Sequence, residues 1–465
     1  MQEQISHYIR LINKFLWDPL IILFIITGIL TTIFSRFIQF KYFFKSFKLI
    51  LTPKKSSDKI NKEDNLTPLQ AFINALSTSI GNGSLAGMAT AVHEGGPGAA
   101  FWIFVLGIFS MPIRFCEVYL SGAYTDPEGS ITTKGPMTYL RHVPGGSILP
   151  GFYAFFCLLL SFVGGNAIQV NSISSGFQNL IANFAKSDFI SHDMKSMILN
   201  GDKYIIAFAL FAFVAYIMLG GSNRIIKFSM AITPIKVALF FISVICLLIY
   251  HMPALIETLR IIIISAFDPQ AIKGAILGTT MMGAIRFGLS RSVNASESGL
   301  GIAAIFFADS SKKSPVESGI MSMVSTFISN YLVCAVLALL VVLTGVWQSD
   351  ATSTVLMTQA FSTLYGSFAN WLIAILSVIF GMSVLVGYAY IGKQCFSYLT
   401  KGKHMWVYSV IYVIIAFLGS IAKVQLIWDS LDLVNAGLMA INLYGILCLL
   451  SQVKIAVTNY MKNNI

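Results

Sequence analysis

The chain has 465 residues, of which 56% are hydrophobic and only 11% charged, and its mean hydropathy is +0.76. This composition excludes an ordinary soluble domain and indicates a membrane protein. The formal net charge of +11 would suit nucleic-acid binding, but no basic patch with stacking aromatics lies on a soluble domain, so we expect no nucleic-acid partner.

Long apolar runs follow one another along the chain, each near the ~20 residues that cross a bilayer core of about 30 Å. They are apolar on all sides, which excludes the alternating pattern of a membrane barrel. We therefore predict an all-α polytopic membrane protein with eleven transmembrane helices, at 16–38, 69–93, 97–124, 150–176, 203–220, 226–250, 270–289, 315–347, 366–391, 405–422 and 428–451.

The polar stretch 52–66 is the one obvious linker. The basic aromatic segment before it, 36–48, suits a helix lying in the headgroup region or an extension of the first span. The distribution of Lys and Arg predicts the direction of the spans, because cytoplasmic loops retain positive charge. Most basic residues share a side when the loop 36–65 is placed inside, which predicts an outside amino terminus and a cytoplasmic carboxyl terminus, with a bacterial inner membrane as the expected location.

Setting the first, peripheral span aside leaves ten, and two successive groups of five spans run through the membrane in opposite senses. Ten core spans therefore permit a five-plus-five inverted repeat. The predicted division of the chain is a first helix with its basic linker, two repeats and a cytoplasmic tail, at 1–65, 66–250, 266–452 and 453–465.

Glycine-rich sequences interrupt the second and seventh spans, which are partners in this repeat. "SIGNGSLAG" (79–87) lies within the second span and "GAILGTTMMGAIRFG" (274–288) within the seventh. Broken helices at matching positions indicate a binding site at the bilayer midplane, where free carbonyls bind a cation and free N–H groups bind a carboxylate. The alternative is that the small residues only let helices pack closely.

Several longer blocks carry a family resemblance. Four of them resemble sequences of the alanine or glycine:cation symporters of bacteria and archaea. These blocks are "GNGSLAGMATAVHEGGPGAAFWIFVLGIFSMPIRFCEVYLSGAYTD" (81–126), "AIRFGLSRSVNASESGLGIA" (284–303), "FGMSVLVGYAYIGKQC" (380–395) and "WDSLDLVNAGLMAINL" (428–443). The resemblance implies the fold of the leucine-transporter superfamily and symport of a small amino acid with sodium.

The resemblance also implies site residues. The sodium ligands would be the carbonyls of Ser77, Ile80 and Phe380 and the hydroxyl of Ser383. Val384 stands where the family has the second of two adjacent threonines, which puts the identity of the ion in question. The substrate would meet the backbone at the break and side chains from three other spans, a set that comprises Gly81, Asn82, Gly83, Ser84, Gln169, Thr279, Thr280 and Tyr388.

Charged residues inside the spans receive mainly structural interpretations. Arg114 and Glu117 are three residues apart on one helix, so we expect them to neutralise each other. Asp429 and Asp432 are placed at the start of the last span, where negative charge is favourable. If the coupling ion were a proton, Glu117 or Asp432 would be the carboxylate to test.

The predicted function is secondary active transport of alanine or glycine by alternating access, with Na⁺ as coupling ion. The alternatives are the same fold with H⁺ coupling or another small solute, and a substrate-sensing receptor, which would need a larger soluble domain than the stretch 52–66 provides. No nucleophile with a neighbouring base and no phosphate-binding loop occurs, so we expect neither an enzyme nor a cofactor. We expect a monomer in the lipid bilayer without an obligate protein partner.

Overall fold

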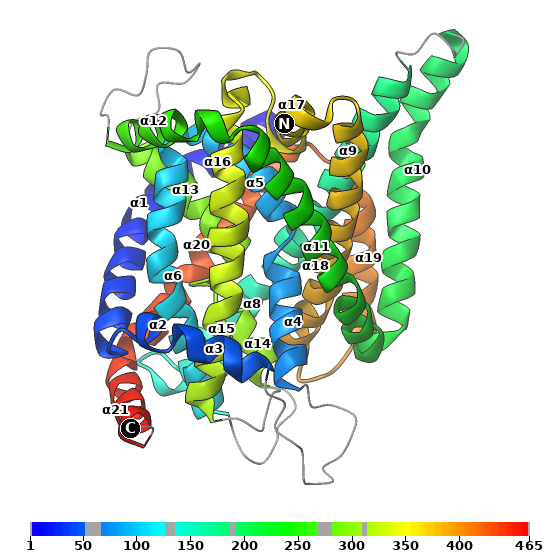
Figure 1. Ribbon diagram of the computed structural model, residues 1–465. Helices are drawn as coiled ribbons and strands as arrows, with labels where there is room; N and C mark the ends of the chain where they lie inside the picture. The colour runs from blue at the N-terminus through cyan, green and yellow to red at the C-terminus, as the bar shows by residue number, and fades with distance from the viewer. Residues whose placement is uncertain are drawn as a thin grey trace.

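Figure 1 shows the computed structural model of the chain, which describes residues 2–51, 67–125, 135–185, 192–267, 281–308 and 314–463. Helices are the only regular elements within these ranges. The two ends of the chain lie at opposite ends of the helical bundle, as an odd number of crossings requires (Figure 1).

The described helices run as follows, with η2 and η4 being π-helical turns and η1, η3 and η5 being 3-10 turns: α1 (Gln2–Phe34), α2 (Ile38–Lys41), α3 (Phe43–Leu51), α4 (Pro68–Ser79), α5 (Asn82–Gly95), α6 (Gly98–Ala123), α7 (Pro136–Tyr139), η1 (Leu140–His142), α8 (Leu149–Phe162), η2 (Val163–Ala167), α9 (Ile168–Ala185), α10 (His192–Leu219), α11 (Gly221–Tyr250), η3 (Met252–Ala254), α12 (Leu255–Phe267), α13 (Met281–Ser296), α14 (Ala303–Ala308), α15 (Pro315–Phe327), η4 (Ile328–Ala335), α16 (Val336–Leu343), η5 (Val346–Gln348), α17 (Ser353–Tyr365), α18 (Phe368–Thr400), α19 (Met405–Ile421), α20 (Val424–Cys448) and α21 (Leu450–Lys462).

Seven of the described helical segments are long and apolar enough to cross a membrane, and two further apolar helices, Tyr204–Leu219 and Met405–Ile421, are shorter. All nine coincide with predicted spans. The two remaining predicted spans are the two expected to be broken. The chain is therefore an all-α multi-pass membrane protein, while the count of eleven and the boundaries of the two repeats remain predictions.

The second predicted span is broken as expected. A capping box between Thr67 and Gln70 starts α4, which ends at Ser79, and α5 starts at Asn82. Ile80 and Gly81 between them are extended, with ψ of 95° and −167°. A side chain at Gly81 would not fit, because its Cβ would lie 2.4 Å from Cγ2 of Val384 on α18.

The described residues cover only part of the interruption predicted for the seventh span. Residues 281–288 of the glycine-rich stretch are continuous helix, and 268–280 lie outside the described residues. A break that was not predicted falls at 297–302, beyond the predicted end of this span and between α13 and α14, where Glu297, Gly299 and Gly301 have positive φ. Gly288, within the predicted break, instead allows close packing, since a Cβ there would meet a carbonyl of α6 at 3.1 Å.

The peripheral helices surround this pair of breaks. α1 packs along α20 and α6, on the outside of the bundle. A turn at Ser35–Phe37 separates α1 from α2 and α3, which run across one end of the bundle beside α15, so the basic aromatic segment is not an extension of the first span (Figure 1). α12 and α17 lie at the opposite end (Figure 1).

Candidate substrate and cation site

A cavity lies where the break between α4 and α5 faces η2, α9, α13 and α18. Its walls are Thr78, Ser79, Gly81, Gly83, Ser84, Gly164, Gln169, Asn294, Ala295, Val384 and Tyr388. Five of the predicted substrate-binding residues are among them, namely Gly81, Gly83, Ser84, Gln169 and Tyr388. Thr279 and Thr280 lie outside the described residues.

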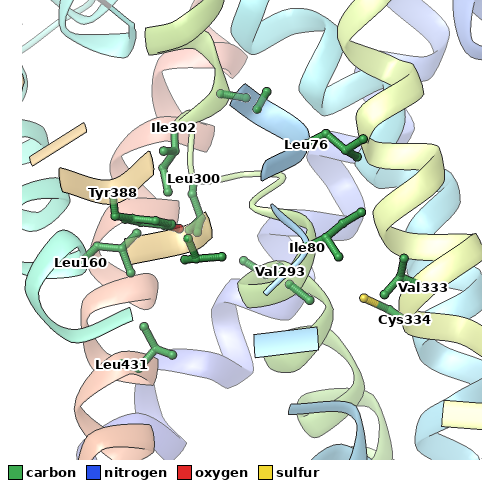
Figure 2. Packing of buried hydrophobic residues seen from close by; sticks show 14 of the residues in the cluster. Leu76, Ile80, Leu160, Val293, Leu300, Ile302, Val333, Cys334, Tyr388 and Leu431 are labelled. Carbon is green, nitrogen blue, oxygen red and sulfur yellow. The ribbon is translucent and has the colours of Figure 1, made fainter. Parts of the chain in front are cut away.

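Buried hydrophobic residues pack around both breaks (Figure 2). Leu76 comes from α4, Ile80 from the first break, Leu300 and Ile302 from the segment between α13 and α14, and Tyr388 from α18. Unwound backbone in an apolar setting needs partners for its free amides and carbonyls, because each unpaired group costs several kcal/mol. The polar contacts that follow are those partners.

Gln169 on α9 binds the start of α5. Its Oε1 accepts a hydrogen bond from the Asn82 N–H at 3.1 Å, and its Nε2 donates to the Gly164 carbonyl at 2.9 Å. One of the first free amides of α5 is thus already satisfied by a protein side chain. Gln169 therefore connects the break to the π-helical turn η2 as well as lining the cavity.

Asn82 was predicted to meet the substrate, but its side chain bridges α5 and α18. Its Nδ2 donates to the Ser377 carbonyl at 3.0 Å, and the Ser377 hydroxyl donates to Oδ1 at 2.9 Å. These two hydrogen bonds explain why an amide side chain stands between two glycines in an apolar segment. Asn82 contributes its backbone to the break and uses its side chain to fix α5 against α18.

Three of the four predicted sodium ligands converge on one point, and the Nζ atom of Lys236 occupies it. Nζ donates to the Ser77 carbonyl at 2.8 Å, to the Ile80 carbonyl at 2.6 Å and to the Ser383 hydroxyl at 2.6 Å. The carbonyl of the fourth ligand, Phe380, instead accepts the Ser383 hydroxyl proton at 2.8 Å. Lys236 is fully buried, on α11.

The sequence analysis missed Lys236, although a signal was present. The residue lies near the middle of the apolar span 226–250, and an ionisable residue at such a place is by default a functional-site candidate. Its partners come from positions around 80 and 380, so no local motif announces them. Glu297, in the motif "NASESG", was also missed as a site residue.

Glu297 joins the second break to the first and to α18. Its Oε1 accepts a hydrogen bond from the Tyr388 hydroxyl at 2.6 Å, and its Oε2 accepts one from the Thr78 hydroxyl at 3.0 Å. Both partners line the cavity. The carboxylate therefore lies behind the cavity wall and connects the two breaks.

Glu117 supports the second break from α6. Its Oε1 accepts the N–H groups of Gly299 and Gly301 at 2.8 and 2.9 Å and the Asn442 amide at 2.8 Å. Arg114 lies beside it, with Nε 3.7 Å from Oε2, which confirms the predicted pairing. The pair thus does more than neutralise itself, because the carboxylate also binds the free amides of an unwound segment.

The interpretation of Asp432 as a residue at the start of a helix is wrong. α20 begins at Val424, so Asp432 lies in its third turn, and Asp429 is not at the start either. Asp432 Oδ1 instead accepts hydrogen bonds from Arg291 at 2.8 Å and from the Ser290 hydroxyl at 2.7 Å. Helix α20 extends further toward its amino terminus than hydropathy indicated, which moves the aspartate from the end into the packed interior.

The buried basic residues differ in their partners. Arg114 and Arg291 each have a carboxylate within 4 Å. Lys236 has none within the described ranges, and its three short contacts are to neutral oxygens. Its surroundings are therefore those of a cation site made of carbonyl and hydroxyl oxygens.

Comparisons with known proteins identify the family and the fold. The model of the "Sodium:alanine symporter family" matches residues 2–465. The sodium/alanine symporter AgcS of Methanococcus maripaludis is 31% identical over 95% of this chain and 94% of its own, and the probable sodium/glutamine symporter GlnT of Bacillus subtilis is 26% identical over 99% and 92%. The crystal structure of MhsT in complex with L-phenylalanine superposes with a TM-score of 0.56 at 14% identity, covering 86% of this chain and 99% of that one. The last similarity confirms the predicted leucine-transporter-like fold.

Proposed function

The chain belongs to the sodium:alanine symporter family, and from this premise we propose that it couples uptake of a small neutral amino acid to inward movement of a cation. It is a membrane transporter and not an enzyme. Both solutes would bind one state of the protein, and their joint occupancy would favour the change to the state open on the other side.

The cavity between the two interrupted helices is the observation that supports this proposal most directly. Gly81, Gly83 and Ser84 reach it from the first break, and Asn294 and Ala295 reach it from the end of α13. The start of α5 favours a carboxylate through its amides and dipole, whereas the carbonyls at the end of α4 favour a positive charge. A zwitterion and a cation are the ligands that such a pair of helix ends suits.

The dimensions of the cavity favour a small substrate. Its free space is small, about that of one water molecule, so the site is nearly closed in this conformation. Gln169, Val384 and Tyr388 limit it on the side of α9 and α18. We propose alanine or glycine as the substrate. Glutamine, which the name of GlnT gives for that relative, serves as the larger amino acid for comparison.

Exchange and uptake measurements test the proposal. The purified protein in liposomes loaded with unlabelled alanine should take up labelled alanine and glycine by exchange, and unlabelled glutamine should compete poorly. Absence of exchange with all three amino acids would refute small-amino-acid transport.

We also propose that the protein functions as a monomer in a bacterial inner membrane with its amino terminus outside and its carboxyl terminus in the cytoplasm. The two termini lie at opposite ends of the bundle (Figure 1), and the basic loops gather on the carboxyl-terminal side of the predicted topology. Cysteine-accessibility labelling of each terminus in intact cells tests the orientation.

A further inference from the structure

We propose that the ammonium group of Lys236 takes the place of the metal cation in this transporter, so that transport needs no sodium. This inference rests on the proposed function and deepens it by naming the group that fills the cation site. It replaces the expectation that Na⁺ binds Ser77, Ile80 and Ser383.

The number and direction of the contacts support an ammonium ion. A lysine ammonium group has three N–H donors and no acceptor. Each donor of Lys236 has its own oxygen, at 2.6 to 2.8 Å, from the last turn of α4, from the break itself and from α18. These distances are those of charge-assisted hydrogen bonds. All the hydrogen-bonding capacity of the charged form is therefore used, and no donor is left unpaired in a fully buried position.

A metal cation and this ammonium group exclude each other. Both would use the same three oxygens, and two positive charges within one such cluster would repel strongly in a buried site. Hard cations such as Ca²⁺ and Mg²⁺ gather six or more oxygen ligands, whereas an ammonium ion needs three acceptors. Val384, which is apolar and 2% exposed, removes a hydroxyl that the resemblance expected beside Ser383. The loss of a ligand and the presence of Lys236 thus favour the same conclusion.

Few charged or titratable groups face Lys236 from the elements packed around it. Glu297, from the segment between α13 and α14, is the charged group that acts on it electrostatically, and Arg114 and Tyr388 act on Glu297 in turn. The neighbouring helices α4 and α16 contain no Asp, Glu, Lys or Arg, and neither does residue range 204–219 of α10. The hydroxyl of Tyr365 on α17 donates a hydrogen bond to the Ser243 carbonyl on α11 at 2.7 Å.

The backbone links Lys236 to the substrate site. Ile80, whose carbonyl accepts from Lys236, directly precedes Gly81, which lines the cavity. The charged lysine therefore stabilises the conformation of the break that presents α5 to the substrate.

Transport measurements in liposomes separate this inference from the proposed function. Exchange of labelled alanine without any gradient tests substrate transport alone. We then expect alanine exchange at the same rate in sodium-free and sodium-containing buffer, and no accumulation from an inward sodium gradient at equal pH. Exchange together with sodium-driven accumulation would overturn the role of Lys236 and retain the proposed function, whereas a lack of all exchange would refute the proposed function.

A Lys236→Met variant removes the charge and keeps most of the volume. It should lower the rate of alanine exchange, because the carbonyls of Ser77 and Ile80 and the Ser383 hydroxyl lose their donor. Lys227→Met on the same helix, where the side chain is exposed, is the matched control and should leave exchange unchanged. Exchange at the wild-type rate in the folded Lys236→Met variant would overturn the inference.

A binding measurement needs no substrate and no functional variant. Sodium that binds the folded state raises the unfolding temperature by mass action. Sodium chloride should stabilise the wild-type protein no more than choline chloride at equal concentration, and specific stabilisation by sodium would overturn the inference even if the lysine variant failed to fold. In the double variant with Lys236→Ala and Val384→Thr, we expect the vacated oxygens and the added hydroxyl to produce a sodium-specific rise in unfolding temperature.

Discussion

Substitution of Gly81 by alanine tests whether close approach of α18 to the break defines the site. Gly81 has a φ of −141°, which any residue can adopt, so backbone strain plays no part. The added methyl would lie 2.4 Å from Cγ2 of Val384 and 3.3 Å from Oε1 of Gln169. Carbon atoms normally pack about 3.5–4.0 Å apart, so the overlap with valine exceeds about 1 Å.

The loss of stability in the Gly81→Ala variant depends on how this overlap can be relieved. A valine has one strongly preferred side-chain rotamer in a helix, so rotating Val384 away is costly, and the alternative is a shift of α18. Overpacking of this kind costs typically about 1–3 kcal/mol. A shift of α18 would also move the Ser383 hydroxyl away from Lys236, so we expect exchange activity to fall together with stability.

Thermal unfolding in detergent, combined with alanine exchange in liposomes, measures both effects. Val384→Ala should restore much of the loss when combined with Gly81→Ala, since it removes the clashing methyl groups, giving a coupling of about 1–3 kcal/mol between the two sites. Gly151→Ala on α8 is the control, because a Cβ there meets nothing within 4 Å. A Gly81→Ala protein as stable as wild type, or a double variant with purely additive losses, would contradict the reasoning.

Three further predictions concern the buried carboxylates. Asp432→Ala should destabilise the protein by about 3–5 kcal/mol, because it leaves Arg291 buried without its partner, and joint replacement by Arg291→Met and Asp432→Leu should recover most of the unfolding temperature. Tyr388→Phe should cost about 1–3 kcal/mol, since Glu297 loses one hydrogen-bond donor, while the ring keeps its place in the cavity wall and the half-saturating alanine concentration in exchange stays the same. Glu117→Ala should lower the yield of folded protein in size-exclusion chromatography far more than Glu117→Gln, because the amide oxygen of glutamine can still accept the two glycine N–H groups; equal yields would show that these contacts matter little.

Hydropathy alone predicted most of the architecture, for a physical reason. Nine predicted spans coincide with apolar helices, because the need to bury backbone hydrogen bonds in lipid leaves helices as the only option for such runs. The first break was also predictable, since Asn82 between two glycines is poor material for an uninterrupted apolar helix. The break at 297–302 was not predicted, because glycine has two uses and the sequence does not distinguish the glycine that permits close packing at 288 from those with positive φ at 299 and 301.

The site itself was only partly predictable from the sequence. Resemblance named the oxygens of Ser77, Ile80 and Ser383, which the structure does bring together, but it did not name Lys236, which donates to all three. A mean over some twenty residues conceals one lysine in an apolar span, and hydropathy contains no information about which oxygens lie opposite it. Only the fold, which brings α11 against α4 and α18, shows that Lys236 reaches them.

The two breaks are stabilised by opposite charges, and this follows from which backbone groups each leaves free. The end of α4 exposes carbonyls, and a cation, Lys236, donates to them; the segment after α13 exposes N–H groups, and an anion, Glu117, accepts from them. Glu117 is neutralised by Arg114 beside it on the same helix, whereas Lys236 has no carboxylate within 4 Å in the described part of the chain. A further cation could therefore reach the first break only by displacing Lys236, whereas the second break needs no ion beyond the pair of Arg114 and Glu117.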